Sequence, residues 1–422
     1  MALSRDTMVI AGPAVPPRRR ARTLWPLPAL ERALIARMLR SLGDVPITAV
    51  LPDGEEIGPR GIVPVARVVF RDARAVFGLA GLVPELRFGD AYAEGRIEVE
   101  GDLVAFLEAV FAAPAPRGPY TAVADWWRSL RRGRNSLRRA RAHIAHHYDL
   151  GNDFYARWLD REMVYTCAYF PHPEATLEEA QQAKMAHVAR KLRLRPGEQV
   201  IEAGCGWGAL ALYLARHHGV RVRAFNISRE QIAWARERAQ AEGLAGQVEF
   251  VEDDYRNVVG SCDAFVSVGM LEHVGPEHYG DLRRVIDRVL SPDGRGLLHF
   301  IGRNRPMCFS AFAERRIFPG AHAPALSEVM TILEPADLSV LDVENLRLHY
   351  ARTLEHWLER FERAGDMVRS RYGERFLRMW RLYLSGSIAG FRTGNLQLFQ
   401  ILFARGRSNR VPWTRADLYA AA

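Results

Sequence analysis

The sequence predicts a doubly wound α/β domain preceded by a smaller α+β domain. Apolar strand candidates alternate with helix-like stretches from about residue 195, and a glycine-rich turn at 204–208 follows the first of these strands. A separate segment of mixed helix and strand character occupies 28–112. Strands that alternate with helices form right-handed parallel crossovers, which place helices on both faces of the sheet.

The larger domain follows from its elements in order. Strands are predicted at 199–203, 220–226, 247–252, 263–269 and 295–302, helices at 209–219, 229–244, 278–294 and 348–365, and a last strand within 392–406. Ligands of such sheets bind outside the carboxyl ends of the strands. Gly204, Asn226, Asp254 and Gly269 all fall at those ends, which predicts a binding site there.

The rest of the chain divides by composition. We expect a disordered basic N-terminus at 1–27, the α+β domain at 28–112, a basic aromatic linker at 113–145 and the larger domain at 146–422. Within the small domain the sequence predicts a helix at 29–42 and strands at 47–52 and 66–70. The segment 88–103 contains three glycines and is interpreted as short strands joined by turns.

The composition is that of an ordinary globular protein, with 48% hydrophobic and 25% charged residues among 422. No apolar run reaches the roughly 20 residues that span a bilayer, and the basic cluster at 18–22 follows the weakly apolar stretch, the reverse of a secretory signal. Four scattered cysteines without a CxxC pair argue against a disulfide framework or a zinc site. We therefore expect a cytoplasmic enzyme without a structural metal.

The net charge of +9 is concentrated in arginine clusters, above all at 126–147 around Trp126 and Trp127. Arginine beside tryptophan suits an anionic lipid surface, where aromatic rings sit at headgroup depth. A solvated basic linker explains the same pattern equally well. Nucleic acid binding has the weakest support, since a basic isoelectric point alone indicates little.

The turn sequence favours S-adenosylmethionine over a dinucleotide. "GCGWG" at 204–208 lacks the GxGxxG spacing that seats a pyrophosphate, and "FNISREQ" offers no acidic residue to the ribose where dinucleotide enzymes carry one, roughly 20 residues on. Asp254 or Asp253 can accept a hydrogen bond from an adenine amino group. Tyr255 either stacks on the adenine ring or packs in the core.

Nine motifs then carry a family resemblance. They are "HYDLGNDFYARWLDREMVYTCAYF" (147–170), "VIEAGCGWG" (200–208), "NISREQ" (226–231), "DDYRNV" (253–258), "VSVGMLEHVG" (266–275), "LLHFIG" (297–302), "IFPG" (317–320), "HYARTLEHW" (349–357) and "FRTGNLQLFQILF" (391–403). In this order they resemble the cyclopropane-fatty-acyl-phospholipid synthases and the mycolic acid cyclopropane synthases. The resemblance implies a Rossmann-like class I S-adenosylmethionine-dependent methyltransferase domain.

The resemblance also implies the reaction and the partners. A methyl group passes from S-adenosylmethionine to the cis double bond of an unsaturated phospholipid acyl chain, and loss of a proton to a bound bicarbonate ion closes a cyclopropane ring. It implies an enzyme, in the form of a homodimer, that associates peripherally with the inner face of the membrane, at an anionic lipid surface and without nucleic acid.

The site residues carried over fall into two groups. Bicarbonate is implied near Cys167, Glu272, His299 and Tyr350. The cofactor is implied to contact Tyr165 and Thr166 (methionine), Gly204, Cys205, Gly206, Trp207 and Gly208 (turn), Asn226, Ser228 and Gln231 (ribose), and Asp254 and Tyr255 (adenine).

These residue types suit that chemistry, because tyrosine and histidine donate to an anion and a carboxylate accepts from the O–H of bicarbonate. Each has a structural alternative: Cys167 as a small buried residue, His299 as a core histidine. Glu344 is a further candidate for hydrogen bonding to the site.

Departures from the family pattern leave the product open. Thr166 and Phe170 stand where many synthases read "YSCAYW", and Asn226 stands where threonine is frequent. A methyl-branched chain, a methylated unsaturated chain or methylation of another lipid or small molecule therefore remain alternatives to the ring, as does a lipid-binding protein without catalysis.

Overall fold

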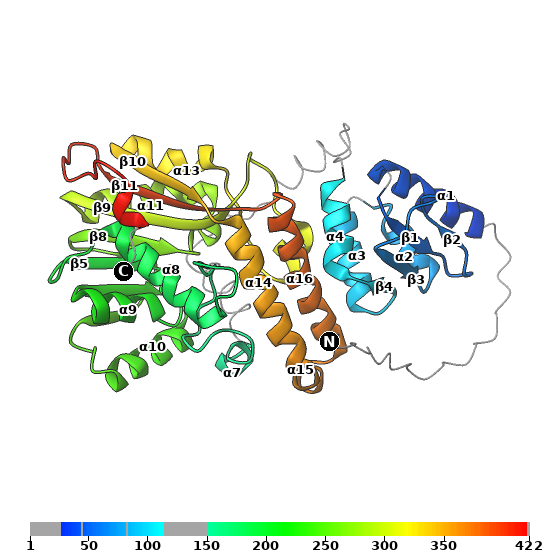
Figure 1. Ribbon diagram of the computed structural model, residues 1–422, viewed down its shortest axis with the longest axis horizontal. Helices are drawn as coiled ribbons and strands as arrows, with labels where there is room; N and C mark the ends of the chain where they lie inside the picture. Colours follow the sequence, from blue (N-terminus) through cyan, green and yellow to red (C-terminus); the bar gives the residue numbers. More distant parts are fainter. Residues whose placement is uncertain (1–26, 44, 82, 114–149, 420–422) are drawn as a thin grey trace, which may run out of the picture.

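The computed structural model describes residues 27–43, 45–81, 83–113 and 150–419 (Figure 1). The expectations for 1–26, for the linker at 114–145 and for Trp126 and Trp127 lie outside these described residues. None of the described helices is both long and apolar enough to cross a bilayer.

The larger unit is built on a seven-stranded sheet with the order β10-β11-β9-β8-β5-β6-β7. Its strands are β5 (Gln199–Ala203), β6 (Arg221–Asn226), β7 (Val248–Glu252), β8 (Cys262–Val268), β9 (Leu290–Gly302), β10 (Leu338–Asn345) and β11 (Gln397–Arg405). The pairs among β5 to β9 are parallel, while β11 lies antiparallel between β9 and β10. The predicted doubly wound domain, with its last strand, is confirmed.

Two helical layers cover the sheet. One holds α8 (Leu177–Leu192), α9 (Ala209–His218) and α10 (Arg229–Ala241), and the other holds α11 (Tyr279–Val289) and α13 (Leu326–Leu333). Successive side chains of a strand point to opposite faces. Val200 accordingly packs in the first layer and Ile201 in the second, which explains why β5 is apolar at consecutive positions.

A third group of helices lies between this sheet and the N-terminal unit (Figure 1). It comprises α14 (Arg347–Arg363), α15 (Gly365–Tyr372) and α16 (Glu374–Arg392), joined by the short α7 (Asn152–Tyr155) and α12 (Ala311–Arg316). Trp158, Trp357 and Trp380 are fully buried here. The Trp158 ring lies 5.6 Å from that of Trp357 and 6.1 Å from that of Trp380, so an aromatic core joins α7 to α14 and α16.

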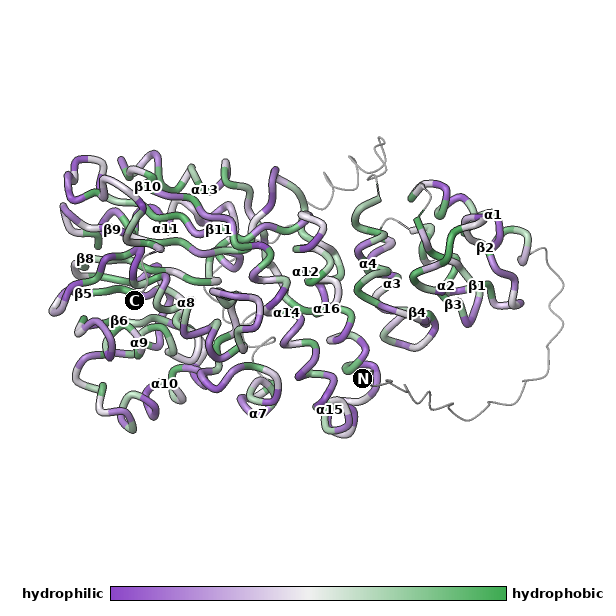
Figure 2. The backbone as a smooth tube through the Cα atoms, viewed as in Figure 1, coloured by the Kyte–Doolittle hydropathy of each residue, from purple (hydrophilic) through white to green (hydrophobic). Residues whose placement is uncertain are grey.

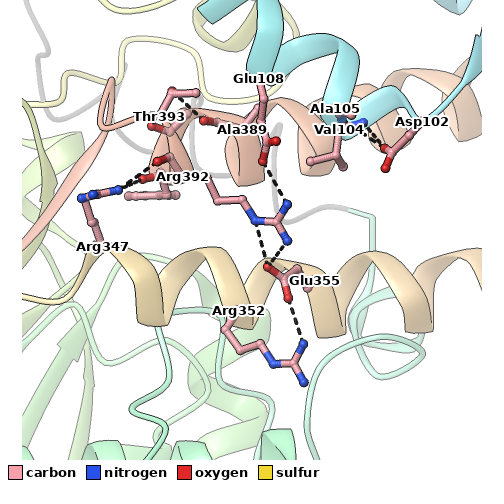
Figure 3. Close-up of polar contacts among 12 residues, drawn as sticks. Asp102, Val104, Ala105, Glu108, Arg347, Arg352, Glu355, Ala389, Arg392 and Thr393 are labelled. Carbon is pink, nitrogen blue, oxygen red and sulfur yellow. Dashed lines mark hydrogen bonds and ion pairs between the residues drawn. The ribbon is translucent and has the colours of Figure 1, made fainter. Parts of the chain in front are cut away.

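The N-terminal unit has a four-stranded sheet in the order β2-β1-β3-β4. Its elements are α1 (Leu27–Leu42), β1 (Ile47–Val50), β2 (Glu56–Ile57), β3 (Ala66–Phe70), α2 (Ala73–Gly78), α3 (Pro84–Ala93), β4 (Ile97–Gly101) and α4 (Leu103–Ala112). Figure 2 shows α4 as apolar along most of its length, and α3 and α4 pack against α16. Arg392 of α16 also pairs with Glu108 of α4 and Glu355 of α14 (Figure 3).

The interpretation of 88–103 is wrong over its first half, since 88–93 belongs to helix α3 and only β4 is a strand. Pro84 stands at the start of α3, where a missing N–H costs nothing. Gly89 serves packing rather than a turn, because a Cβ there would lie 2.3 Å from the Phe312 ring of α12. That contact joins segments more than 200 residues apart, so no local pattern predicts it.

Candidate active site

A pocket of about 1120 Å³, including its open mouth, lies at the carboxyl ends of β5, β6, β7 and β8. Ten of the twelve predicted cofactor residues line it: Tyr165, Thr166, Gly204, Cys205, Gly206, Trp207, Asn226, Gln231, Asp254 and Tyr255. The other two cap helices instead. Gly208 precedes α9, and Ser228 Oγ accepts from the backbone N–H of Gln231 at the start of α10.

Glycine is required at two positions of the turn, 206 and 208, for different structural reasons. Gly206 has a φ of +53°, and a Cβ built there meets nothing within 4 Å, so this backbone borders open pocket. Gly208 has a φ of +85°, and its Cβ would lie 2.6 Å from the Phe250 ring and 2.8 Å from Ala235. The first glycine therefore leaves room for a ligand, and the second lets α9 pack closely on its neighbours.

The end of β6 is fixed by a side-chain network. Asn226 Nδ2 donates to Gly206 O at 3.2 Å and to Gln231 Oε1 at 2.8 Å, so both of its amide protons are used within the protein. Nε2 of Gln231 is buried without a hydrogen-bond partner among the described residues. An unpaired buried donor that lines a pocket can satisfy an acceptor of a ligand; Gln231 offers such a donor, whereas the amide protons of Asn226 are used within the protein.

The predicted adenine residues follow β7 in the short helix η1 (Tyr255–Asn257). Asp254 is buried and accepts from Arg256 through both carboxylate oxygens, at 2.7 and 2.9 Å. This bidentate pair was not expected from the sequence, and it occupies much of the carboxylate's capacity to accept from an adenine amino group. The Tyr255 hydroxyl is buried without a partner among the described residues, and burial raises its pKa.

Tyr165 and Trp207 are held by polar contacts on the side of the pocket nearer α14 and α16. The Tyr165 hydroxyl lies 2.9 Å from the Tyr383 hydroxyl, and Trp207 Nε1 donates to Asn152 Oδ1 at 2.8 Å. Asn152 belongs to the first family motif, so the structure gives that residue a positioning role.

Sequence reasoning missed two charged residues of the pocket, Lys184 and Glu202. Both are buried, and burial raises the pKa of Glu202 to about 7 and lowers that of Lys184 to about 8. Lys184 Nζ donates to Thr166 Oγ1 at 3.3 Å, while Glu202 Oε2 has no partner among the described residues. The available signal was a glutamate inside the apolar strand "QVIEA", because buried carboxylates are rarely structural without a partner.

Glu272 and His299, two of the predicted catalytic residues, lie at adjoining strand ends. Glu272 follows β8 in the short helix η2 (Leu271–His273), and its Oε1 accepts from the backbone N–H of Ile301 on β9 at 2.6 Å. His299 lies two residues earlier on β9 and pairs with Val268 of β8. Both side chains are buried, and Glu272 Oε2 and His299 Nε2 have no partner among the described residues.

Burial dictates the charge of these two groups. It raises the pKa of Glu272 to about 7, against the hydrogen bond from Ile301 that lowers it. Burial, followed by the charges of Lys184, Lys191 and His187, lowers the pKa of His299 to about 3. At neutral pH the imidazole is therefore uncharged, and the carboxyl is poised to gain or lose a proton.

Helix α14 carries Tyr350 and contacts the backbone next to Cys167. Tyr350 lies on the first turn of this helix, with its ring 4.7 Å from that of Phe391. Thr353, one turn further, accepts from the backbone N–H of Ala168 at 3.0 Å. Cys167 is fully buried and its thiol donates to Ala168 O at 3.1 Å; burial raises its pKa, so the side chain is a neutral thiol.

Shared neighbours link three of the four predicted catalytic residues. Lys184 acts electrostatically on both Cys167 and His299, and β9 carries both His299 and the partner of Glu272. None of the four belongs to the described lining of the cofactor pocket, although Cys167 follows Thr166 and Glu272 precedes His273, which do line it; the four are called the neighbouring group below. Glu344, the further candidate, instead binds His187 at 2.7 Å and Lys191 at 2.6 Å.

Comparisons with known proteins agree with this geometry. The family described as "Mycolic acid cyclopropane synthetase" matches residues 135–401. A "Probable fatty acid methyltransferase" from Pseudomonas putida is 36% identical over 89% of this chain and 96% of its own. The cyclopropane-fatty-acyl-phospholipid synthase of Escherichia coli K12 is 41% identical over 62% of this chain and 68% of its own.

A solved structure shares the fold of the larger unit. The mycolic acid cyclopropane synthase CmaA1 complexed with SAH and CTAB covers 63% of this chain and 98% of its own, with a TM-score of 0.60 and 28% identity.

Proposed function

This chain belongs to the mycolic acid cyclopropane synthetase family, and we propose that it converts the cis double bond of an unsaturated phospholipid acyl chain into a cyclopropane ring. It is an S-adenosylmethionine-dependent methyltransferase that acts on lipid. The observation that carries the finer proposal is the buried pair of Glu272 and His299, each with an unpaired polar atom among the described residues. Methyl transfer to an alkene leaves a carbocation, and ring closure must then remove a proton from the added methyl group, a step that a buried proton-handling group would serve.

The pocket fits S-adenosylmethionine. Gln231 Nε2 offers a donor to a ribose hydroxyl, and Glu202 Oε2 offers an acceptor to the methionine ammonium group. Gly206 leaves its backbone open to the ligand. When bound, this cofactor supplies an electrophilic methyl group.

The neighbouring group fits bicarbonate, which would supply a base. His299 is neutral and presents Nε2, and Glu272 presents Oε2 as an acceptor for an O–H. Tyr350 and the backbone at Cys167 complete the proposed set. Hydrogen bonds from neutral donors would offset part of the cost of burying a small anion there.

The chain's own residues then shape the reaction. The Trp357 ring packs against Tyr350 and Tyr165, with ring centroids 5.9 and 5.2 Å apart, and this apolar contact would help to keep water away from a cationic centre that water would trap. Glu272 Oε2 would accept a hydrogen bond from the O–H of the anion, which would leave the other oxygens of the anion free to act as a base. The departing proton leaves from the transferred methyl as the ring closes.

The partners remain part of this proposal. An unsaturated phospholipid at an anionic membrane surface supplies the acyl chain, and the enzyme works as a homodimer on the inner face of the membrane. The arginine and tryptophan segment at 126–147 or the N-terminal unit would dock on lipid. Vesicle sedimentation with Arg131, Arg132, Arg138 and Arg139 replaced by serine tests this, and unchanged binding would exclude the segment.

A methyl-branched or methylated unsaturated product is the second candidate. It is supported by the name of the Pseudomonas putida relative, "Probable fatty acid methyltransferase", which matches nearly the whole chain.

Lipid analysis of expressing cells tests the proposal. The host should make cis-unsaturated phospholipids, lack its own synthase and be fed methyl-labelled methionine. Gas chromatography and mass spectrometry should show an acyl chain with one labelled methylene and no double bond. A labelled chain that keeps its double bond would favour the second candidate, and the absence of labelled lipid would overturn both.

A further inference from the structure

Three neighbouring strands place His299, Gln400 and Glu344 in a row across the sheet. His299 of β9 pairs with Gln400 of β11, and Gln400 pairs with Glu344 of β10. Residues directly opposite one another on adjacent strands project from the same face. His299 and Gln400 are buried, and the Glu344 side chain is 17% exposed.

The amide of Gln400 contacts the ring of His299. Gln400 Nε2 lies 3.0 Å from His299 Nδ1, and the other ring nitrogen, Nε2, has no partner among the described residues. In a neutral imidazole one nitrogen donates and the other accepts. If Nδ1 accepts from the amide, the proton of the imidazole resides on Nε2.

Burial, and after it the charges that face this row, keep His299 neutral. Lys184 and Lys191 of α8, together with His187, oppose a proton on the ring, while Glu344 acts in the other direction. Glu344 is itself occupied, since it accepts from His187 and Lys191. Burial raises the pKa of Glu344, but the hydrogen bonds and charges of His187 and Lys191 outweigh burial and lower the pKa to about 2. The Glu344 carboxylate thus balances the charge of Lys191, and its hydrogen bonds go to His187 and Lys191 instead of His299.

We propose that Gln400 is a positioning residue that holds His299 as the tautomer with its proton on Nε2, so that Nε2–H donates to the anion held beside Glu272. This inference rests on the proposed function and adds a residue to it. Gln400 acts through His299 and has no contact with the reacting atoms. A ring with the opposite tautomer would present a lone pair to the anion and repel it.

The test compares Gln400→Leu and Gln400→Glu with Gln397→Leu. Gln397 is a buried amide on the same strand, but it bonds Asn345 and Gly394 instead of His299, so it controls for loss of a buried amide. The Glu side chain has the size of Gln and accepts from Nδ1–H, which should reverse the tautomer.

Two measurements are made on the full chain. Nitrogen NMR of protein labelled at histidine, with the His299 signals assigned from a His299→Asn variant, reports which ring nitrogen carries the proton. Turnover on unsaturated phospholipid vesicles and the Kd of S-adenosylmethionine report function.

We expect a protonated Nε2 in the native protein and in Gln397→Leu, and a protonated Nδ1 in Gln400→Glu. Both Gln400 variants should lose about tenfold or more in kcat with an unchanged cofactor Kd, as second-layer partners of site residues commonly do. A native protein protonated on Nδ1, or Gln400→Glu with the native tautomer and native kcat, would overturn the inference. Because the NMR readout needs no turnover, an inactive native protein would contradict the proposed function alone.

Discussion

Oε1 of Glu272 accepts a hydrogen bond from the backbone N–H of Ile301 at 2.6 Å, which ties the end of β8 to β9 and leaves Oε2 unpaired among the described residues. This contact fixes the carboxyl beside the strand that carries His299. It orients Glu272 without saturating it, which is the arrangement that a proton-handling group needs.

Glu272→Gln should stabilise the protein more at pH 8 than at pH 4.5. Burial raises the pKa of this carboxyl from 4.5 to about 7 in the folded state, so ionisation opposes folding as pH rises through that window and the penalty is complete above pH 7. The variant removes it, and its advantage should grow to the order of 1–3 kcal/mol. Urea unfolding at several pH values measures this, with the exposed Glu237→Gln as control. Parallel stability profiles for the two variants would contradict titration of the buried Glu272 carboxyl.

Turnover of Glu272→Gln should fall about 100-fold or more.

Gly206→Ala and Gly208→Ala should fail in different ways. Alanine at 206 has space but requires a positive φ, so it should cost about 1–2 kcal/mol and place a methyl group where the cofactor lies. Alanine at 208 collides with Phe250 and Ala235 and should cost more stability. Calorimetry of unfolding and of S-adenosylmethionine binding separates these effects. If Gly206→Ala bound S-adenosylmethionine as tightly as the native protein, the cofactor would not lie against this glycine.

Glu202→Gln should weaken S-adenosylmethionine binding by about tenfold, because a charged acceptor for the methionine ammonium group is replaced by a neutral amide. Titration calorimetry measures the Kd, with Glu237→Gln on the exposed face of α10 as the matched control. An analogue of S-adenosylmethionine that lacks the amino group should bind the native protein and Glu202→Gln with equal Kd. An unchanged Kd in Glu202→Gln would assign this carboxylate a structural role.

Asn152→Leu should loosen Trp207, whose indole N–H donates to Asn152 Oδ1. We expect a loss of about 1 kcal/mol in the free energy of unfolding and a several-fold weaker cofactor Kd. Asn152→Asp keeps an acceptor at the same position and should retain most of both. Tryptophan fluorescence quenching follows the binding, and equal losses in the two variants would show that the hydrogen bond is not the cause.

Local patterns predicted the strands β5 to β9, the last strand β11 and the helices α9, α10, α11 and α14, because each is readable within its own residues. The strand β10 and the helices α8 and α13 were not predicted. The turn at 204–208 was found the same way, since glycines between a strand and a helix have one common use. Cofactor residues at strand ends follow from the parallel topology. Eight of the ten that line the pocket lie at or follow strand ends in this way, whereas Tyr165 and Thr166 came from the resemblance.

Features that depend on distant contacts were not predictable. Gly89 was assigned to a turn because its partner, Phe312, lies far along the chain. Lys184 lines the cofactor pocket only because α8 packs on the sheet, and Gln400 contacts His299 only because β11 pairs with β9. The grouping of Cys167 with Tyr350 came from the resemblance, because neither residue carries a signal of its own.

The central claim, ring closure on a phospholipid acyl chain, is tested most directly with purified protein, S-adenosylmethionine that carries a fully deuterated methyl group, and vesicles of cis-unsaturated phospholipid. Ring formation removes one hydrogen isotope from the transferred methyl, so the account predicts a product that retains two of the three deuterium atoms and has no double bond. A product that retains all three deuterium atoms, as a methylated alkene formed by loss of a proton from the acyl chain would, contradicts it.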